Sequence, residues 1–150
     1  MKYERYEFNV GKKFMSYDFQ SDGPKGKVIK LIQYFETQLK GFYNLGFGDK
    51  CPITGEIDDF VITNNGDSKK VLATVAATVY TFTNNYPNSW IYAIGSSKAR
   101  TRLYRMGISN NLTEITQDFE IHGHKDNAWH VFERNVDYDA FLIRRKSLNS

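Results

Sequence analysis

Apolar and polar residues alternate over much of the chain, which is the pattern of β-strands that bury one face. Clusters of Gly, Pro, Asn, Asp and Ser, which favour turns, separate many of these segments. The alternating segments cover residues 3–10, 14–20, 27–38, 42–47, 57–63, 90–94, 118–124, 128–133 and 140–145. A helix competes with the strand over residues 28–40, where apolar residues occupy both faces, but no capping residue precedes that segment.

Helical spacing replaces the alternation over residues 68–85. Apolar side chains recur there at intervals of three and four, namely Val71, Leu72, Val75, Val79, Phe82 and Tyr86. Asp67 stands where a capping residue would accept from the first free backbone N–H groups, and Pro87 cannot continue the helix. The spacing therefore predicts a helix over residues 68–85.

A second, basic helix is expected over about residues 97–106. Gly107 follows it and is suited to the left-handed conformation that often ends a helix. Residues 109–111 then precede one more helical turn that runs through Ile115. The sequence thus predicts two main helices and a third, short one.

The order of these elements predicts the fold class. Residues 57–94 run strand, helix, strand, which fits a right-handed parallel crossover, whereas short turns elsewhere join antiparallel neighbours. We expect a single α+β domain over residues 1–150, with a mixed, mainly antiparallel sheet of about seven strands. The chain has 150 residues, 41% of them hydrophobic, which is enough for one core.

Composition bears on the cellular location. No run of 18 apolar residues predicts a membrane span, and the first ten residues lack the apolar segment of a signal peptide. The single cysteine, Cys51, fits a reducing compartment. We therefore expect a cytoplasmic protein without a membrane partner.

Positive charge is concentrated in the basic helix. The net charge is +3, and four cations without an anion lie between residues 96 and 108, namely Lys98, Arg100, Arg102 and Arg105. Three of these, at positions 98, 102 and 105, share one helix face. Ser96 and Ser97 add hydroxyls and free N–H groups at the helix N-terminus, which suits a phosphate or carboxylate. The alternative is internal ion pairing with Asp58, Asp59 or Glu120, or a solvated face.

Two weaker clusters carry chemistry-bearing side chains. His122 and His124 point to one face of a predicted strand, and Asp126 or His130 would complete a metal site. An exposed hairpin edge is the preferred interpretation, and we expect no metal. The acidic residues Glu56, Asp58 and Asp59 fit a base or a metal ligand, but a solvated strand start is the preferred interpretation.

Three runs of sequence resemble an uncharacterised family of small bacterial proteins that is common in the Bacteroidota. They are IDDFVITNNGDSKKVLATVA at residues 57–76, WIYAIGSSKARTRLYRMGI at residues 90–108, and FLIRRK at residues 141–146. This resemblance implies no activity.

More distantly, residues 57–146 resemble the GCN5-related N-acetyltransferases in the order of their elements, with Leu103-Tyr104 and Gly107 in the second helix. The resemblance implies an acyl-CoA N-acyltransferase-like fold. It also implies a slot for acetyl-CoA between splayed strands beside residues 90–94, and Tyr104 as the general acid toward the departing thiolate. The glycine-rich pyrophosphate loop of that family is absent, because Asn64-Asn65-Gly66-Asp67-Ser68 stands in its place.

The leading hypothesis is a non-enzymatic binding or regulatory module without a cofactor. It would contact an anionic partner, nucleic acid or an acidic protein surface, through Ser96, Ser97, Lys98, Arg100, Arg102 and Arg105, joined by Arg144 and Arg145. The alternative is an acyl-CoA-dependent N-acetyltransferase-like enzyme with a degenerate cofactor loop. A third hypothesis is self-association through an exposed aromatic interface, for which the ten tyrosines and eleven phenylalanines of the chain leave room.

Overall fold

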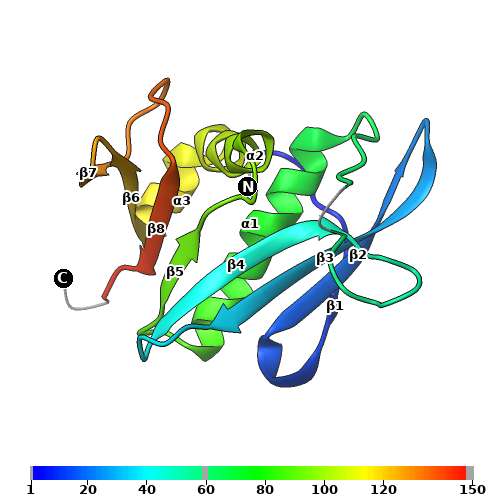
Figure 1. The fold of residues 1–150 in the computed structure, drawn as a ribbon, viewed down its shortest axis with the longest axis horizontal. Helices are drawn as coiled ribbons and strands as arrows, with labels where there is room; N and C mark the ends of the chain where they lie inside the picture. Colours follow the sequence, from blue (N-terminus) through cyan, green and yellow to red (C-terminus); the bar gives the residue numbers. More distant parts are fainter. Residues whose placement is uncertain (1, 59–60, 148–150) are drawn as a thin grey trace.

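The computed structural model describes residues 2–58 and 61–147, which form one eight-stranded sheet with three α-helices (Figure 1). The strands are β1 (Asn9–Val10), β2 (Ser16–Gly23), β3 (Gly26–Glu36), β4 (Phe42–Asp49), β5 (Trp90–Ala93), β6 (Phe119–Lys125), β7 (Ala128–Val131) and β8 (Ala140–Arg145). The helices are α1 (Ser68–Asn85), α2 (Lys98–Asn110) and α3 (Leu112–Asp118), and a short 3-10 turn, η1, spans Lys12–Phe14. None of the described helices is long and apolar enough to cross a membrane.

The strand order is β1-β2-β3-β4-β5-β8-β6-β7, and every pair is antiparallel except β4 with β5. The parallel pair is short, because only Phe42, Tyr43 and Asn44 of β4 face residues of β5. The last strand, β8, lies between β5 and β6. The structure thus confirms a mixed, mainly antiparallel α+β fold, with eight strands among the described residues where about seven were expected.

The core lies between the sheet and α1, which crosses behind the strands in Figure 1. Its centre is an aromatic stack in which the rings of Tyr34 and Phe82 lie 4.1 Å apart and almost parallel. The hydroxyl of Tyr34 is hydrogen-bonded to Thr78 at 3.0 Å, so the buried polar atom is satisfied. Burial of Val71, Val75, Val79 and Phe82 on one side of α1 is the outcome that the spacing predicts.

The strand predicted over residues 57–63 is wrong. Ile57 makes an isolated bridge with Lys50, and residues 59–60 lie outside the described part of the chain. The backbone of Thr63 is instead bonded to side chains, because its N–H donates to Asp49 and its carbonyl accepts from Lys30. The parallel partner of β5 is therefore β4, and the first predicted strand shrinks to Asn9–Val10.

A buried ion pair holds this segment against the sheet. Lys30 is only 1% exposed, and its Nζ donates to Asp49 Oδ1 at 2.5 Å and to the carbonyl of Thr63 at 2.7 Å. The other carboxylate oxygen of Asp49 accepts from the Thr63 N–H at 3.0 Å. Charges leave water at little net cost only when such partners replace it. The pair fixes the path of the chain toward α1.

Gly107 does not end the basic helix, because α2 continues to Asn110. Asn111 closes α2 and stands at the start of α3, and its side-chain amide donates to the carbonyl of Gly107 at 2.9 Å. Gly107 is not among the residues with positive φ. The prediction of a left-handed residue was wrong because the amide of Asn111 satisfies the helix carbonyl.

Candidate functional site around helix α2

The hydroxyl groups of Ser97 and Thr101 hold the start of α2 in place. Ser97 Oγ accepts from the Arg100 N–H at 3.2 Å and caps the helix. Thr101 Oγ1 accepts from the Gly95 N–H at 3.0 Å and donates to the Ser97 carbonyl at 3.1 Å. The first turn contains no acidic residue. Ser96 and Ser97, which were predicted to bind an anion together, therefore have different positions. Ser97 caps the helix, and Ser96 lines a neighbouring cleft.

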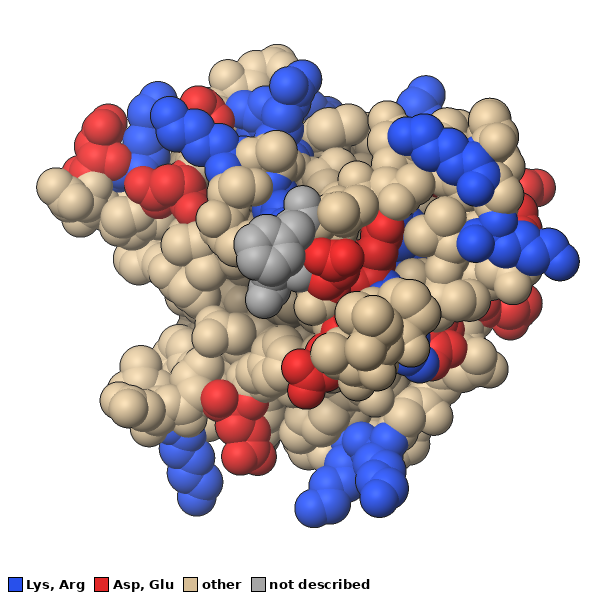
Figure 2. Space-filling view, turned by 45° about the vertical axis from the view of Figure 1, so that its right-hand side comes forward, with Lys and Arg blue, Asp and Glu red and all other residues tan. Residues whose placement is uncertain are grey.

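Three of the predicted cations meet at one groove. Lys98, Arg102 and Arg105 line a hollow of about 590 Å³ together with Asp137, Tyr138 and Asp139. Lys98 and Arg102 are exposed, and neither has a hydrogen bond or an ion pair within the described ranges. Figure 2 shows lysine and arginine side chains gathered along the top of the molecule with carboxylates among them.

The third cation of the groove, Arg105, has a partner. It donates to Asp137 Oδ1 at 3.3 Å, and the Asp137 side chain is 93% exposed. Exposed pairs of this kind contribute little to stability and are screened by salt. The groove therefore presents two unpaired cations and one loosely paired cation.

Arg100 does not belong to this surface. It turns inward, and its Nη1 and Nη2 donate to the carbonyls of Phe47 and Asp58 at 3.3 Å and 2.7 Å. The group of Asp58 that accepts from Arg100 is its backbone carbonyl, and Asp59 lies outside the described residues. Backbone carbonyls thus hold the Arg100 guanidinium within the fold, and its contact with an anion stays a prediction.

A cleft opens where β4 and β5 part. Their pairing stops at Asn44 and Tyr92, and a hollow of about 320 Å³ begins there, lined among others by Leu45, Gly46, Ile94, Ser96 and Tyr104. The Tyr104 hydroxyl donates to the Leu45 carbonyl at 3.2 Å. Burial raises the pKa of Tyr104 to about 12, so its hydroxyl stays protonated at neutral pH.

The free edge of β4 along this cleft is already bonded. The carbonyl of Leu45 accepts from Tyr104, that of Phe47 accepts from Arg100, and that of Asp49 accepts from the Asp58 N–H at 2.7 Å. These donors come from the chain itself. Any ligand that pairs with the same carbonyls must displace them.

The start of α1 carries a carboxylate, as the sequence indicated. Asp67 makes no side-chain capping bond, and its Oδ2 accepts instead from Tyr6 at 2.5 Å and from Ser21 at 2.6 Å. Desolvation and the bond to Asp67 raise the pKa of Tyr6. The Asp67 carboxylate thus ties α1 to β2 at the place where the resemblance would put a diphosphate.

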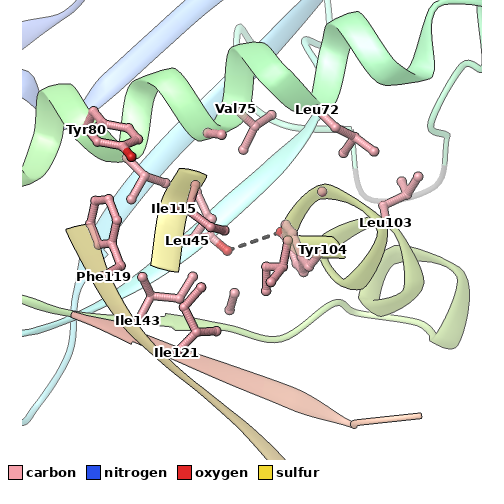
Figure 3. Close-up of a pocket in the computed structure, with 15 residues that line it drawn as sticks. Leu45, Leu72, Val75, Tyr80, Leu103, Tyr104, Ile115, Phe119, Ile121 and Ile143 are labelled. Atoms are coloured by element: carbon pink, nitrogen blue, oxygen red, sulfur yellow. Dashed lines mark hydrogen bonds between the residues drawn. The ribbon is translucent and has the colours of Figure 1, made fainter. Parts of the chain in front are cut away.

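Behind Tyr104 lies an apolar cavity of about 60 Å³ (Figure 3). Side chains from the three α-helices and from β4, β5, β6 and β8 line it, as Figure 3 shows for the labelled residues. Leu45 and Tyr104 line both this cavity and the cleft. The Tyr104 ring is therefore part of the wall between them.

Residues 2–146 match the profile of a family of unknown function (DUF6934). The chain belongs to this family. No curated protein and no solved structure matches the chain. The expectation of an uncharacterised family is thereby confirmed, and the description of DUF6934 names no activity.

In this DUF6934 member, the side chains of the two weaker predicted clusters differ in their contacts. His124 Nδ1 lies 2.6 Å from Asp139 Oδ1, and its ring packs against Trp129. The buried Nδ1 of His122 has no hydrogen-bond partner among the residues that the structure describes. Within the described ranges, no three His, Cys, Asp or Glu side chains are grouped closely enough to hold a metal ion. Glu56 lines the cleft between β4 and β5.

In the DUF6934 protein, Arg145 is bonded to α1, away from the cations of α2 with which the sequence analysis grouped it. Its guanidinium donates to Thr83 Oγ1 and to the carbonyl of Tyr80, at distances of 3.0 Å and 3.1 Å from Nη2. Arg144 lies over the Trp90 ring at 5.0 Å. Arg145 thus joins β8 to α1, and its part in a binding surface stays a prediction.

Sequence reasoning missed Asp137 and Tyr138, which form the far wall of the basic groove. They lie in the segment between β7 and β8, where no periodic pattern indicates which side chain turns inward. Tyr138 is 5% exposed, and its hydroxyl accepts from the Glu133 N–H at 3.0 Å. An isolated aromatic residue in a polar loop was the one signal that this position is packed.

Proposed function

We propose that this protein is a non-enzymatic binding or regulatory module that contacts an anionic partner, nucleic acid or an acidic protein surface, through α2. The observation that carries the proposal is the pair Lys98 and Arg102. Both are exposed on one groove, and neither has a partner among the residues described. A side chain that stabilised the fold by ion pairing would have a carboxylate beside it.

The position of the charges on the helix supports the proposal. Lys98 is in the first turn of α2 and Arg102 in the second, near the positive end of the helix dipole. Cations there oppose the dipole, and no acidic residue in the first turn compensates them. A bound anion would relieve this repulsion and would also meet the two side chains.

The carboxylates of the groove determine how tightly an anionic partner is expected to bind. Asp137 is bonded to Arg105, and Asp139 to His124, so both reduce the positive potential near the two unpaired cations. We therefore expect weak binding that depends on ionic strength. For nucleic acid, the loss between about 50 and 200 mM salt follows the number of phosphates that the protein neutralises.

The test replaces Lys98 and Arg102 with glutamate and measures the anisotropy of a labelled mixed-sequence oligonucleotide and of a labelled acidic peptide. We expect the double variant to lose binding of whichever probe the native protein binds. The matched control replaces Lys27 and Lys40, which are also exposed cations and lie outside the groove. Equal loss in the control, or intact binding in the α2 variant, would overturn the proposal.

A second candidate function is acyl-CoA-dependent N-acyl transfer, and the cleft between β4 and β5 favours it. Parallel strands that part after three residue pairs, with Tyr104 beside the opening, are what that activity needs. The protonated Tyr104 hydroxyl also suits a general acid. Arg100 on the Phe47 carbonyl and the carboxylate of Asp67 weigh against it.

Acetyl-CoA distinguishes the two candidates. Under the transferase reading, acetyl-CoA raises the melting temperature of the protein, because a ligand that binds only the native state stabilises it. Tyr104→Phe then lowers turnover of an amine acceptor without unfolding the protein. If acetyl-CoA at millimolar concentration leaves the melting temperature unchanged, the transferase candidate is rejected and the α2 proposal is unaffected.

A further inference from the structure

A second groove lies on the other flank of α2, between this helix and α1. It has a volume of about 390 Å³, and its apolar walls include Val71 and Leu72 of α1 and Leu103 and Met106 of α2. Leu72 and Leu103 also line the apolar cavity behind Tyr104. The groove and the cavity therefore adjoin at these two leucines, and Figure 3 shows both side chains on one side of the cavity.

The walls of the cavity are almost entirely apolar. Two of its lining residues carry hydroxyls, and both are engaged, since Tyr80 donates to Asp118 at 2.7 Å and Tyr104 donates to the Leu45 carbonyl. A cavity without polar groups stays dry and accepts apolar ligands. Its 60 Å³ is several times the ~10–15 Å³ that one water needs, so the end of a hydrocarbon chain fits in it.

Gly107 lines this cavity and has no conformational reason to be glycine. It lies inside α2, where glycine lowers helix stability relative to alanine. A Cβ built on it would meet Leu72 at 3.5 Å, which is an ordinary contact. The missing side chain therefore leaves space beside Leu72, where the cavity and the groove adjoin.

One charged side chain of the groove has no partner among the described residues. Lys30 is paired with Asp49, and Asp67 accepts from Tyr6 and Ser21, so the charged groups at the sheet end of the groove are satisfied. Arg102 lines the groove without a partner in the described part of the chain. An anionic head group is therefore complementary to it.

We propose that the groove and the cavity form one binding site for a small anionic amphiphile. Its hydrocarbon tail lies against Leu72, Leu103 and Met106 and ends in the cavity, and its carboxylate or phosphate head meets Arg102. This site goes beyond the proposed function, because it lies on the opposite flank of α2 and takes a small molecule. The two sites share only Arg102.

The first experiment measures the melting temperature and the calorimetric affinity with octanoate, octyl phosphate, 1-octanol and acetate. We expect both octyl anions to bind, 1-octanol to bind more weakly, and acetate not to bind. Comparison of the two octyl anions identifies the preferred head group. Each methylene added to a shorter carboxylate should raise the affinity about three- to fourfold until the cavity is full.

Two variants separate the tail from the head. Gly107→Val should weaken octanoate binding because its side chain enters the space beside Leu72, and Gly107→Ala serves if the valine variant does not fold. Arg102→Gln should weaken octanoate about fivefold and leave 1-octanol unchanged. Lys98→Gln is the control, since Lys98 is an exposed cation that lines only the other groove.

Three results would overturn the site. They are no stabilisation by either octyl anion, equal binding of acetate and octanoate, and unchanged octanoate affinity in both Gly107 variants. Each would leave the proposed contact of nucleic acid or acidic protein with Lys98 and Arg102 standing, because neither Gly107 nor the cavity takes part in it.

Discussion

The guanidinium of Arg100 donates to the carbonyl of Phe47 across the cleft between β4 and β5, at 3.3 Å. The same side chain donates to the Asp58 carbonyl, so it joins α2 to the edge of β4 and to the segment that follows β4. In a sheet without a split, the neighbouring strand would supply these donors. Arg100 is thus a structural replacement for strand pairing.

Arg100→Ala should therefore destabilise the fold. Two part-buried carbonyls lose their donors, and unsatisfied groups of this kind cost about 1–3 kcal/mol. Urea unfolding measures the change in free energy of unfolding. Lys98→Ala, on the same helix, should change it by less than about 0.5 kcal/mol. Equal effects in the two variants would contradict the structural role of Arg100.

Because Lys30 and Asp49 form a buried ion pair, substitutions at the two positions should have strongly non-additive effects on the free energy of unfolding. Lys30→Met alone should cost about 3–5 kcal/mol, because it leaves the Asp49 carboxylate buried without its cation. Removing both charges, with Asp49→Leu added, should cost much less than the sum of the single losses. A double-mutant cycle in urea checks this, and additive losses would show that the charges do not depend on each other.

Alkaline pH should weaken the fold through Tyr104. Its folded pKa of about 12 lies above the ordinary value of 10.0, so the native state keeps a proton that the unfolded chain loses. The stabilisation is complete below pH 10 and declines by about 1.4 kcal/mol per pH unit between pH 10 and 12. Tyr104→Phe should flatten this decline in the free energy of unfolding. Other tyrosines with raised pKa values keep part of it in both proteins, so the difference between the two curves is the test.

Gly107→Ala should stabilise the protein in the absence of any ligand. Alanine improves helix propensity by about 1 kcal/mol, and its methyl group meets Leu72 at an ordinary contact distance. The thermal midpoint of unfolding should therefore rise. A fall would show that the helix around Gly107 cannot accept a Cβ, and would remove the reason to connect this glycine with the cavity.

Regular periodicity made much of the fold predictable. The helix over Ser68–Asn85 follows from the spacing of Val71, Val75, Val79 and Phe82, because one face must be buried against the sheet. The strand Ala140–Arg145 follows from its apolar alternation. The helical spacing of Lys98, Arg102 and Arg105 likewise placed these cations on one groove. Local pattern suffices where one face of an element meets the core.

The remaining features depend on neighbours far away in the sequence. The pairing of Lys30 with Asp49 requires the register of β3 on β4, which alternation alone does not determine. Arg100 turns inward because the carbonyls of Phe47 and Asp58 lie within its reach. Residues 57–63 have the alternating pattern of a strand, yet the backbone N–H and carbonyl of Thr63 are bonded to the side chains of Asp49 and Lys30. Only the assembled sheet shows these partners.

The place of β8 in the sheet has a consequence for the order of events during protein synthesis. Strands β2, β3 and β4 follow one another in sequence and pair as neighbours, so this half can form as soon as it leaves the ribosome. The hairpin of β6 and β7 has no strand partner in the rest of the sheet until Ala140–Arg145 arrives between β5 and β6. A nascent chain that stalls before residue 140 therefore exposes two strand edges that only β8 can cover, and such edges invite aggregation.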